Sequence, residues 1–192
     1  MRTRKLALGV IVLIVCVGGV LVLNSLRPKY VGQAHTEAMI NGKKVSIVYG
    51  QPSVEGPAIG GRDPLSIAPV GFVWRFGRNE ATLIESAGRM VVGGKELAAG
   101  KYTLWARRLG EDQWVISFHP KTWEWYGRPL WGDVTGGAAR LQDGFIADMP
   151  LTTEKVSDRA KFLNIKLSED KGQAVVTIHF GNIVQTGTFT VN

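Results

Sequence analysis

Apolar and polar residues alternate along most of the chain, in short segments separated by glycine-rich or polar turns. The alternation is clearest over residues 44–49, where every second residue is apolar, as expected for a half-buried strand. The preceding segment, residues 35–40, is joined to it by Asn41-Gly42, a dipeptide typical of a two-residue hairpin. Further predicted strands cover residues 81–85, 89–92, 101–107, 113–119, 145–149, 162–167, 174–180 and 183–191.

Turn residues separate these segments and support the strand prediction. They are Gly93-Gly94, Gly110-Glu111-Asp112, Asp170-Lys171-Gly172 and Gly181-Asn182. The best helical alternative in this part of the chain is residues 152–161, and it is short. The sequence therefore predicts an all-β fold, as one antiparallel β-sandwich or jelly-roll-like domain.

The beginning of the chain has a different pattern. Arg2, Arg4 and Lys5 precede an uninterrupted apolar run over residues 6–23, long enough as a helix (roughly 27 Å) to cross the hydrocarbon core of a bilayer. A cleaved secretory signal is the alternative, but its apolar stretch is usually shorter and a small-x-small cleavage site follows it. We therefore expect a transmembrane helix that acts as an uncleaved signal-anchor. The positive-inside rule places the N-terminus in the cytoplasm and the domain in the periplasm.

These patterns divide the chain into a basic start (residues 1–5), an anchor (6–26), a linker (27–34) and a β domain (35–192). The net charge is +7, three of it in the basic start, and acidic residues are interspersed throughout the domain, so we expect no nucleic-acid partner. Cys16 is the only cysteine and lies in the apolar run. No cofactor or metal is expected, because the histidines lack metal-ligand spacing. His119 and His179 are predicted to point away from the core.

The most unusual segment is residues 71–82, which gathers diverse chemistry within a few positions. It contains a stacking ring, a fixed cation, an amide, a carboxylate and a hydroxyl: Trp74, Arg75, Asn79, Glu80 and Thr82. A second unusual segment, residues 121–139, contains three tryptophans: Trp123, Trp125 and Trp131. Long irregular segments in a compact domain are often functional, and residues 50–79 and 121–139 are both expected to be ordered loops.

The segment 71–82 resembles the domain-of-unknown-function 2911 family of bacterial envelope proteins, whose members carry a run like Val-Trp-Arg-x-Gly-x-Asn-Glu-Ala-Thr. The resemblance extends over residues 41–45, 49–54, 60–62, 97–104 and 114–116. It departs at Pro69-Val70-Gly71, where a Pro-Tyr-Gly step is common, and at Arg78, where a small residue is usual. The resemblance implies a β-sandwich and an envelope location, without an established reaction.

Two interpretations of the polar segment stay open. In the first, Arg75 or Arg62 clamps an anionic group in a pocket at a sheet end. In the second, which we favour, Arg75 or Arg62 pairs with Glu80 and closes the sandwich. The tryptophan-rich segment is equally open, because exposed rings would stack on sugars or dock on a partner, whereas a loop folded over a sheet end would bury them.

The sequence contains no set of catalytic residues at a recognisable spacing, so we expect a binding module rather than an enzyme. Its ligand-binding candidates are Arg62, Trp74, Arg75, Asn79, Glu80, Thr82, Trp123, Trp125 and Trp131. The partner would be an envelope protein or a glycan. One alternative is a hydrolase with Glu80 or Asp133 as general base and Arg75 stabilising negative charge. Another is an accessory subunit of a larger membrane protein complex.

Overall fold

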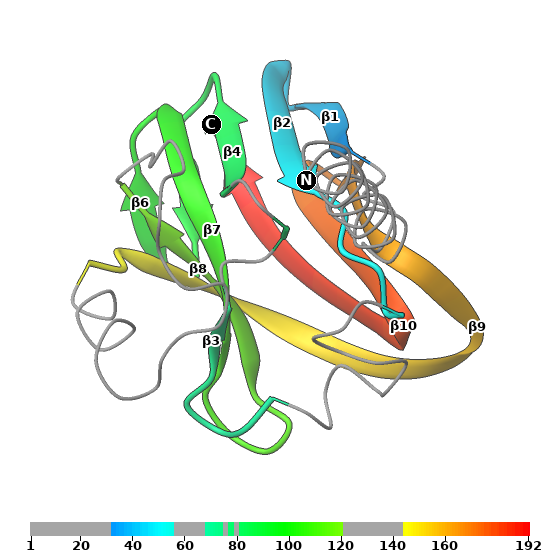
Figure 1. Ribbon diagram of the computed structural model, residues 1–192. Helices are drawn as coiled ribbons and strands as arrows, with labels where there is room; N and C mark the ends of the chain where they lie inside the picture. Colours follow the sequence, from blue (N-terminus) through cyan, green and yellow to red (C-terminus); the bar gives the residue numbers. More distant parts are fainter. Residues whose placement is uncertain (1–31, 56–67, 75–76, 79–80, 121–143) are drawn as a thin grey trace, which may run out of the picture.

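The computed structural model describes residues 32–55, 68–74, 77–78, 81–120 and 144–192 (Figure 1). Over these residues the chain is all-β, and ten antiparallel strands form one sheet in the order β1-β2-β4-β7-β8-β9-β10-β5-β6, with β3 beside β7. The strands are β1 (Gln33–Ile40), β2 (Lys43–Gly50), β3 (Val73–Trp74), β4 (Thr82–Ser86), β5 (Met90–Val92), β6 (Lys95–Leu97), β7 (Gly100–Arg108), β8 (Trp114–His119), β9 (Ala147–Asp170) and β10 (Gln173–Val191).

None of the described residues belongs to a helix long and apolar enough to cross a bilayer. The predicted anchor, residues 6–26, lies outside the described part of the chain.

The sheet turns over on itself through β9, which is 24 residues long. The first residues of β9 pair with β8, and its later residues pair with β10. Figure 1 shows β9 running across the molecule from the β7–β8 side to the β10 side. The arrangement is sandwich-like, as predicted, but the hydrogen-bonded strands are continuous from β1 to β6.

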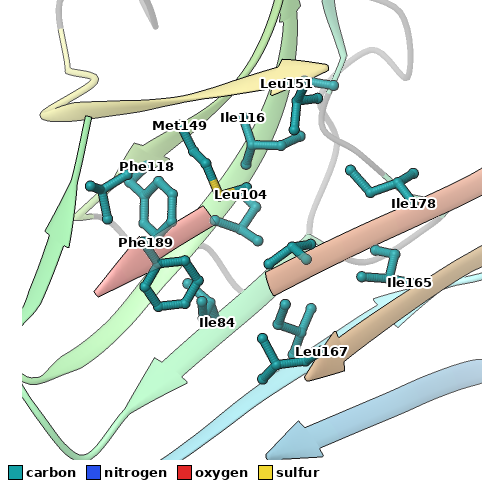
Figure 2. Packing of buried hydrophobic residues seen from close by; sticks show 14 of the residues in the cluster. Ile84, Leu104, Ile116, Phe118, Met149, Leu151, Ile165, Leu167, Ile178 and Phe189 are labelled. Atoms are coloured by element: carbon teal, nitrogen blue, oxygen red, sulfur yellow. The ribbon is translucent and has the colours of Figure 1, made fainter. Parts of the chain in front are cut away.

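The core lies between the two halves of this sheet. Figure 2 shows side chains from β4, β7, β8 and the start of β9 gathered with side chains from the rest of β9 and from β10. Ile84, Leu104 and Ile116 belong to the first group, and Ile165 and Ile178 belong to the second. The alternation of the strands explains this arrangement, since every second residue of each strand turns inward.

Three tight turns confirm the hairpin predictions. Asn41 and Gly42 have φ values of 48° and 73°, and Lys171 and Gly172 have values of 49° and 79°, as a primed two-residue turn requires. Gly93-Gly94 links β5 to β6 in the same way. The Asn41 side chain also donates from Nδ2 to the carbonyl oxygens of Gly172 and Val191, at 3.0 Å each. The first hairpin is thereby tied to the last.

The predicted turn at Gly181-Asn182 is wrong. Both residues lie inside β10, and the pairing with β9 shifts register on either side of Gly181. β10 continues through this point with an irregularity in its pairing with β9, where Gly181 has a φ of 64°. Residues 152–161, the helical alternative, belong to β9.

Other predicted strands also merge. Residues 147–149 and 162–167 lie in β9, while 174–180 and 183–191 form one β10. The short strands β3 and β6 were not predicted, because two or three residues are too few to show alternation.

The edge of β9 that does not pair with β10 is sealed by side chains of the N-terminal hairpin and of Gln51, which follows it. Ile165 N donates to Tyr49 Oη at 2.9 Å, and Tyr49 Oη donates to the Ile165 carbonyl at 3.3 Å. Leu167 N donates to Thr36 Oγ1 at 3.0 Å, and Gln51 Nε2 donates to the Leu163 carbonyl at 3.1 Å. Unpaired strand edges invite unwanted association, so these contacts protect β9.

Candidate functional site

Two of the predicted site residues, Trp74 and Thr82, are described, and both face the core. Trp74 on β3 pairs with Ala106 of β7, and Thr82 on β4 pairs with Leu104 of β7. Ala106 and Leu104 both point into the core. The Trp74 ring stacks on Phe180 with centroids 6.0 Å apart. Both side chains therefore contribute to packing between the two halves of the sheet; Thr82 is fully buried, whereas Trp74 stays partly exposed.

The other predicted site residues lie outside the described part of the chain: Arg62, Arg75, Asn79, Glu80, Trp123, Trp125, Trp131 and Asp133. The two interpretations of the polar segment and of the tryptophan-rich segment stay predictions.

The described part of the polar segment touches the end of β2 through backbone. A Cβ on Gly50 would stand 2.0 Å from the carbonyl oxygen of Arg78, far inside van der Waals contact. A Cβ on Gly77 would stand 2.8 Å from Thr82 Oγ1, and Gly77 has a φ of 150°. Glycine is required at position 50 because the Arg78 backbone approaches so closely, and at position 77 because of its positive φ and the nearby Thr82 hydroxyl. The sequence motifs around Gly50 and Gly77 are thus partners in the fold.

A different group of side chains gathers on the outer face of the sheet, meaning the face of β1, β2, β4, β7, β8 and the start of β9 that turns away from the core. Strand alternation places Ser117 and His119 on this face, opposite the inward Ile116 and Phe118. The register places Trp105, Ser117 and Asp148 side by side on β7, β8 and β9.

The polar contacts in this group centre on one carboxylate oxygen. Ser117 Oγ donates to Asp148 Oδ1 at 2.6 Å, and Arg107 Nη1 donates to the same oxygen at 3.3 Å. Arg107 Nη1 also donates to Ser117 Oγ at 3.3 Å. No described residue accepts a hydrogen bond from Arg107 Nε or Nη2. Arg107 Nη1 is therefore hydrogen-bonded within the protein, whereas Nε and Nη2 have no acceptor among the described residues.

The aromatic contacts centre on Phe145. The Arg107 guanidinium carbon lies 4.9 Å from the Phe145 ring centroid, within cation–π range. The Trp105 ring lies 6.3 Å away and tilted, and the His119 ring lies 5.9 Å away and edge-on. The preceding residue, Gly144, lies against the edge of the His119 ring, so a side chain there would displace that ring. We call Trp105, Arg107, Ser117, His119, Phe145 and Asp148 the Arg107 cluster.

The cluster consists of a buried part and a partly exposed part. Ser117 and His119 are 0% and 4% exposed. The Arg107 and Asp148 side chains are 17% and 40% exposed, and the Trp105 and Phe145 rings are partly exposed. The partly exposed part therefore combines two aromatic rings with a paired cation and anion, which suits stacking and hydrogen bonding. Ser117 is poorly placed as a nucleophile, because its hydroxyl is buried and donates to a carboxylate.

Among the described residues, the charges on the outer face are balanced in pairs. Besides Arg107–Asp148, Lys44 pairs with Glu37 at 2.8 Å and Lys101 pairs with Glu85 at 3.3 Å. The hydrogen bond from Lys44 is the largest cause that lowers the pKa of Glu37. In the described part of the chain, no three His, Cys, Asp or Glu side chains come together as a metal site.

The Arg107 cluster was not among the residues predicted from sequence. The outward direction of His119 was predicted correctly, and the same alternation indicates that Trp105 and Arg107 share a face of β7. What sequence alone did not supply was the β8–β9 register, which brings Asp148 beside Ser117. A cluster assembled across three strands has no signature in linear spacing.

Comparison with known proteins agrees with the resemblance seen in the motifs. No curated protein and no solved structure matches the chain. The family described as "Protein of unknown function (DUF2911)" matches residues 32–186, which include every described strand but the last residues of β10. The chain therefore belongs to the DUF2911 family.

Proposed function

We propose that this protein is a non-catalytic, membrane-anchored binding module of the bacterial envelope, and that the Arg107 cluster is its binding surface. The observation that carries the proposal is the Nε–Nη2 edge of Arg107, which donates to no described residue, together with the partly exposed Phe145 ring under the guanidinium and the Trp105 ring beside Phe145. Binding sites typically combine apolar and aromatic surface with a few well-placed polar groups. Arg and Trp are also enriched where binding energy is concentrated.

Binding is a better interpretation of this cluster than catalysis. A general base needs a carboxylate able to accept a proton from a substrate, and Asp148 is already compensated by Arg107 and Ser117. The hydrolase alternative rests on Glu80, Asp133 and Arg75, which lie outside the described residues.

The location of the module is part of the proposal. The basic start and the apolar run at residues 6–23 support a single-pass anchor with a cytoplasmic N-terminus and a periplasmic domain. The order of the strands supports a single sandwich over residues 35–192, and we propose a jelly-roll-like arrangement for it.

Site-directed photo-crosslinking in native membranes tests the binding surface. Ile146 is 40% exposed, lies next to Phe145 and offers a position for a photoreactive amino acid in the full-length protein. Met39 on β1 is 58% exposed and serves as the matched control, because it is apolar and accessible but distant in the strand order from β8, the strand with which the start of β9 pairs. We expect light-dependent adducts with an envelope component at position 146 and not at position 39. Equal yields at the two positions, or none at either, would contradict the proposal.

A further inference from the structure

We propose that the ligand of the Arg107 cluster is a neutral saccharide, held through a pair of adjacent hydroxyl groups. This inference rests on the proposed function, since it names the class of ligand that the same surface binds. Three features support it: the charge balance of the face, the arrangement of donors and acceptors, and the aromatic rings beside them.

The charge balance of the outer face favours an uncharged ligand. Each described lysine or arginine that is ion-paired on this face has one carboxylate partner: Lys44–Glu37, Lys101–Glu85 and Arg107–Asp148, with His35 also beside Glu37. A surface that recognises an anion uses cations that are not already compensated, as in arginine clusters that bind phosphate. Here an incoming carboxylate or phosphate would meet Asp148 together with Arg107.

The free hydrogen-bonding groups match hydroxyls. Asp148 Oδ1 accepts both protein hydrogen bonds, and no described residue donates to Asp148 Oδ2. The Arg107 Nε–Nη2 edge likewise donates to no described residue, and Arg107 is held to this carboxylate through Nη1. A hydroxyl can donate and accept at once, so one hydroxyl of a vicinal pair can accept from Arg107 while its neighbour donates to Asp148.

The rings provide the apolar half of such a site. Trp105 and Phe145 lie 6.3 Å apart, centroid to centroid, with their planes inclined at 58°. A pyranose ring has an apolar face of C–H groups and a rim of hydroxyls. Stacking that face on an aromatic ring removes apolar surface from water while the rim reaches polar partners.

Titration of the full-length protein in detergent micelles tests the inference. The probes are maltotriose, cellotriose and chitotriose, with trigalacturonic acid as the acidic comparison, followed by calorimetry and tryptophan fluorescence. We expect at least one neutral trisaccharide to bind, with an affinity that changes less than twofold between low and high salt, because an uncharged ligand feels no screening.

Asp148→Asn is the decisive variant. It is nearly isosteric and keeps an oxygen for Ser117 and Arg107, but it replaces the free acceptor with an NH2 donor. We expect an affinity loss of about tenfold, the effect of one lost hydrogen bond. Trp105→Ala, which removes one ring, should also weaken binding. The control is Glu96→Gln, because Arg89–Glu96 is another arginine–carboxylate pair, at 3.2 Å, with no ring contact described. It should bind like the parent.

Each outcome has a defined meaning. Binding of trigalacturonic acid alone would overturn the neutral-saccharide inference and leave the proposed binding surface standing. Failure of every saccharide, with crosslinks at position 146, would also overturn the inference and indicate a protein partner. Failure of every saccharide, with no such crosslinks, would overturn both. Equal binding by the parent and by a folded Asp148→Asn variant would show that the saccharide binds elsewhere, against the inference.

Discussion

Replacing Tyr49 with Phe tests whether the N-terminal hairpin seals the edge of β9. The Tyr49 ring is buried, and its hydroxyl both accepts from Ile165 N at 2.9 Å and donates to the Ile165 carbonyl at 3.3 Å. Phenylalanine keeps the ring packing and removes only the hydroxyl. Two buried backbone groups then lose their partner, which costs about 1–3 kcal/mol because neither reaches water. We expect a destabilisation of about 2 kcal/mol, or a fall in melting temperature of about 4–8 °C for a domain of this size.

Tyr102→Phe is the matched control for this substitution. Tyr102 Oη makes one hydrogen bond, to the Ala98 carbonyl at 2.8 Å, and Ala98 is exposed. Water can replace the lost hydroxyl there, so the cost should stay below about 1 kcal/mol. Both melts are followed by circular dichroism and by urea unfolding. If Tyr49→Phe melts no lower than Tyr102→Phe, the hydroxyl does not protect β9 and the reasoning is refuted.

Four other predictions concern the hairpin, the backbone crossing, pH and the anchor. Gly42→Val should cost about 1 kcal/mol or more, because a β-branched residue resists the φ of 73°; an unchanged melting temperature would contradict this. Gly50→Ala should lower the melting temperature more than Gly94→Ala, because a Cβ at position 94 meets no atom within 4 Å and suffers only the strain of its φ of 78°. Burial raises the pKa of Tyr49, so the folded pKa exceeds the unfolded value; the resulting stability is full below about pH 10 and is lost as pH rises through the folded pKa. Alkaline urea titrations should show this loss in the parent and less of it in Tyr49→Phe. Intact-mass measurement of membrane-extracted protein should retain residues 2–23, and a mature N-terminus between Leu23 and Gln33 would refute the anchor.

Most strands were predictable because one face of each is buried and the other meets solvent. The segment 44–49 shows this alternation directly, and its partner was predictable because Asn41-Gly42 leaves little choice of turn. The turn predicted at Gly181-Asn182 was wrong for a physical reason. Gly181 has a turn-like positive φ but lies at an irregularity within a strand. Local chemistry does not distinguish the two, because the difference depends on the partner strand.

The candidate site was less predictable than the fold. Trp74 and Thr82 attract attention in sequence because they stand among diverse polar residues, yet both face the core. Asp148 does not stand out in the sequence, because it gains its partners only when β9 pairs with β8 and brings it beside Ser117 and Arg107. Strand register is set by the burial of whole faces and not by nearby residues, so a cross-strand site emerges only from the folded sheet.

The central claim, that the Arg107 cluster is the binding surface, is tested most directly by combining crosslinking with disruption of the cluster. A photoreactive residue at position 146 of the full-length protein is compared in native membranes with and without Trp105→Ala, which removes one partly exposed ring; Trp105 lies on β7, whereas the probe directly precedes β9. Expression and melting temperature of the two proteins are measured alongside. We predict that adducts at position 146 form in the parent and fall at least severalfold in the folded Trp105→Ala protein. Adducts of equal yield in both proteins would contradict the claim.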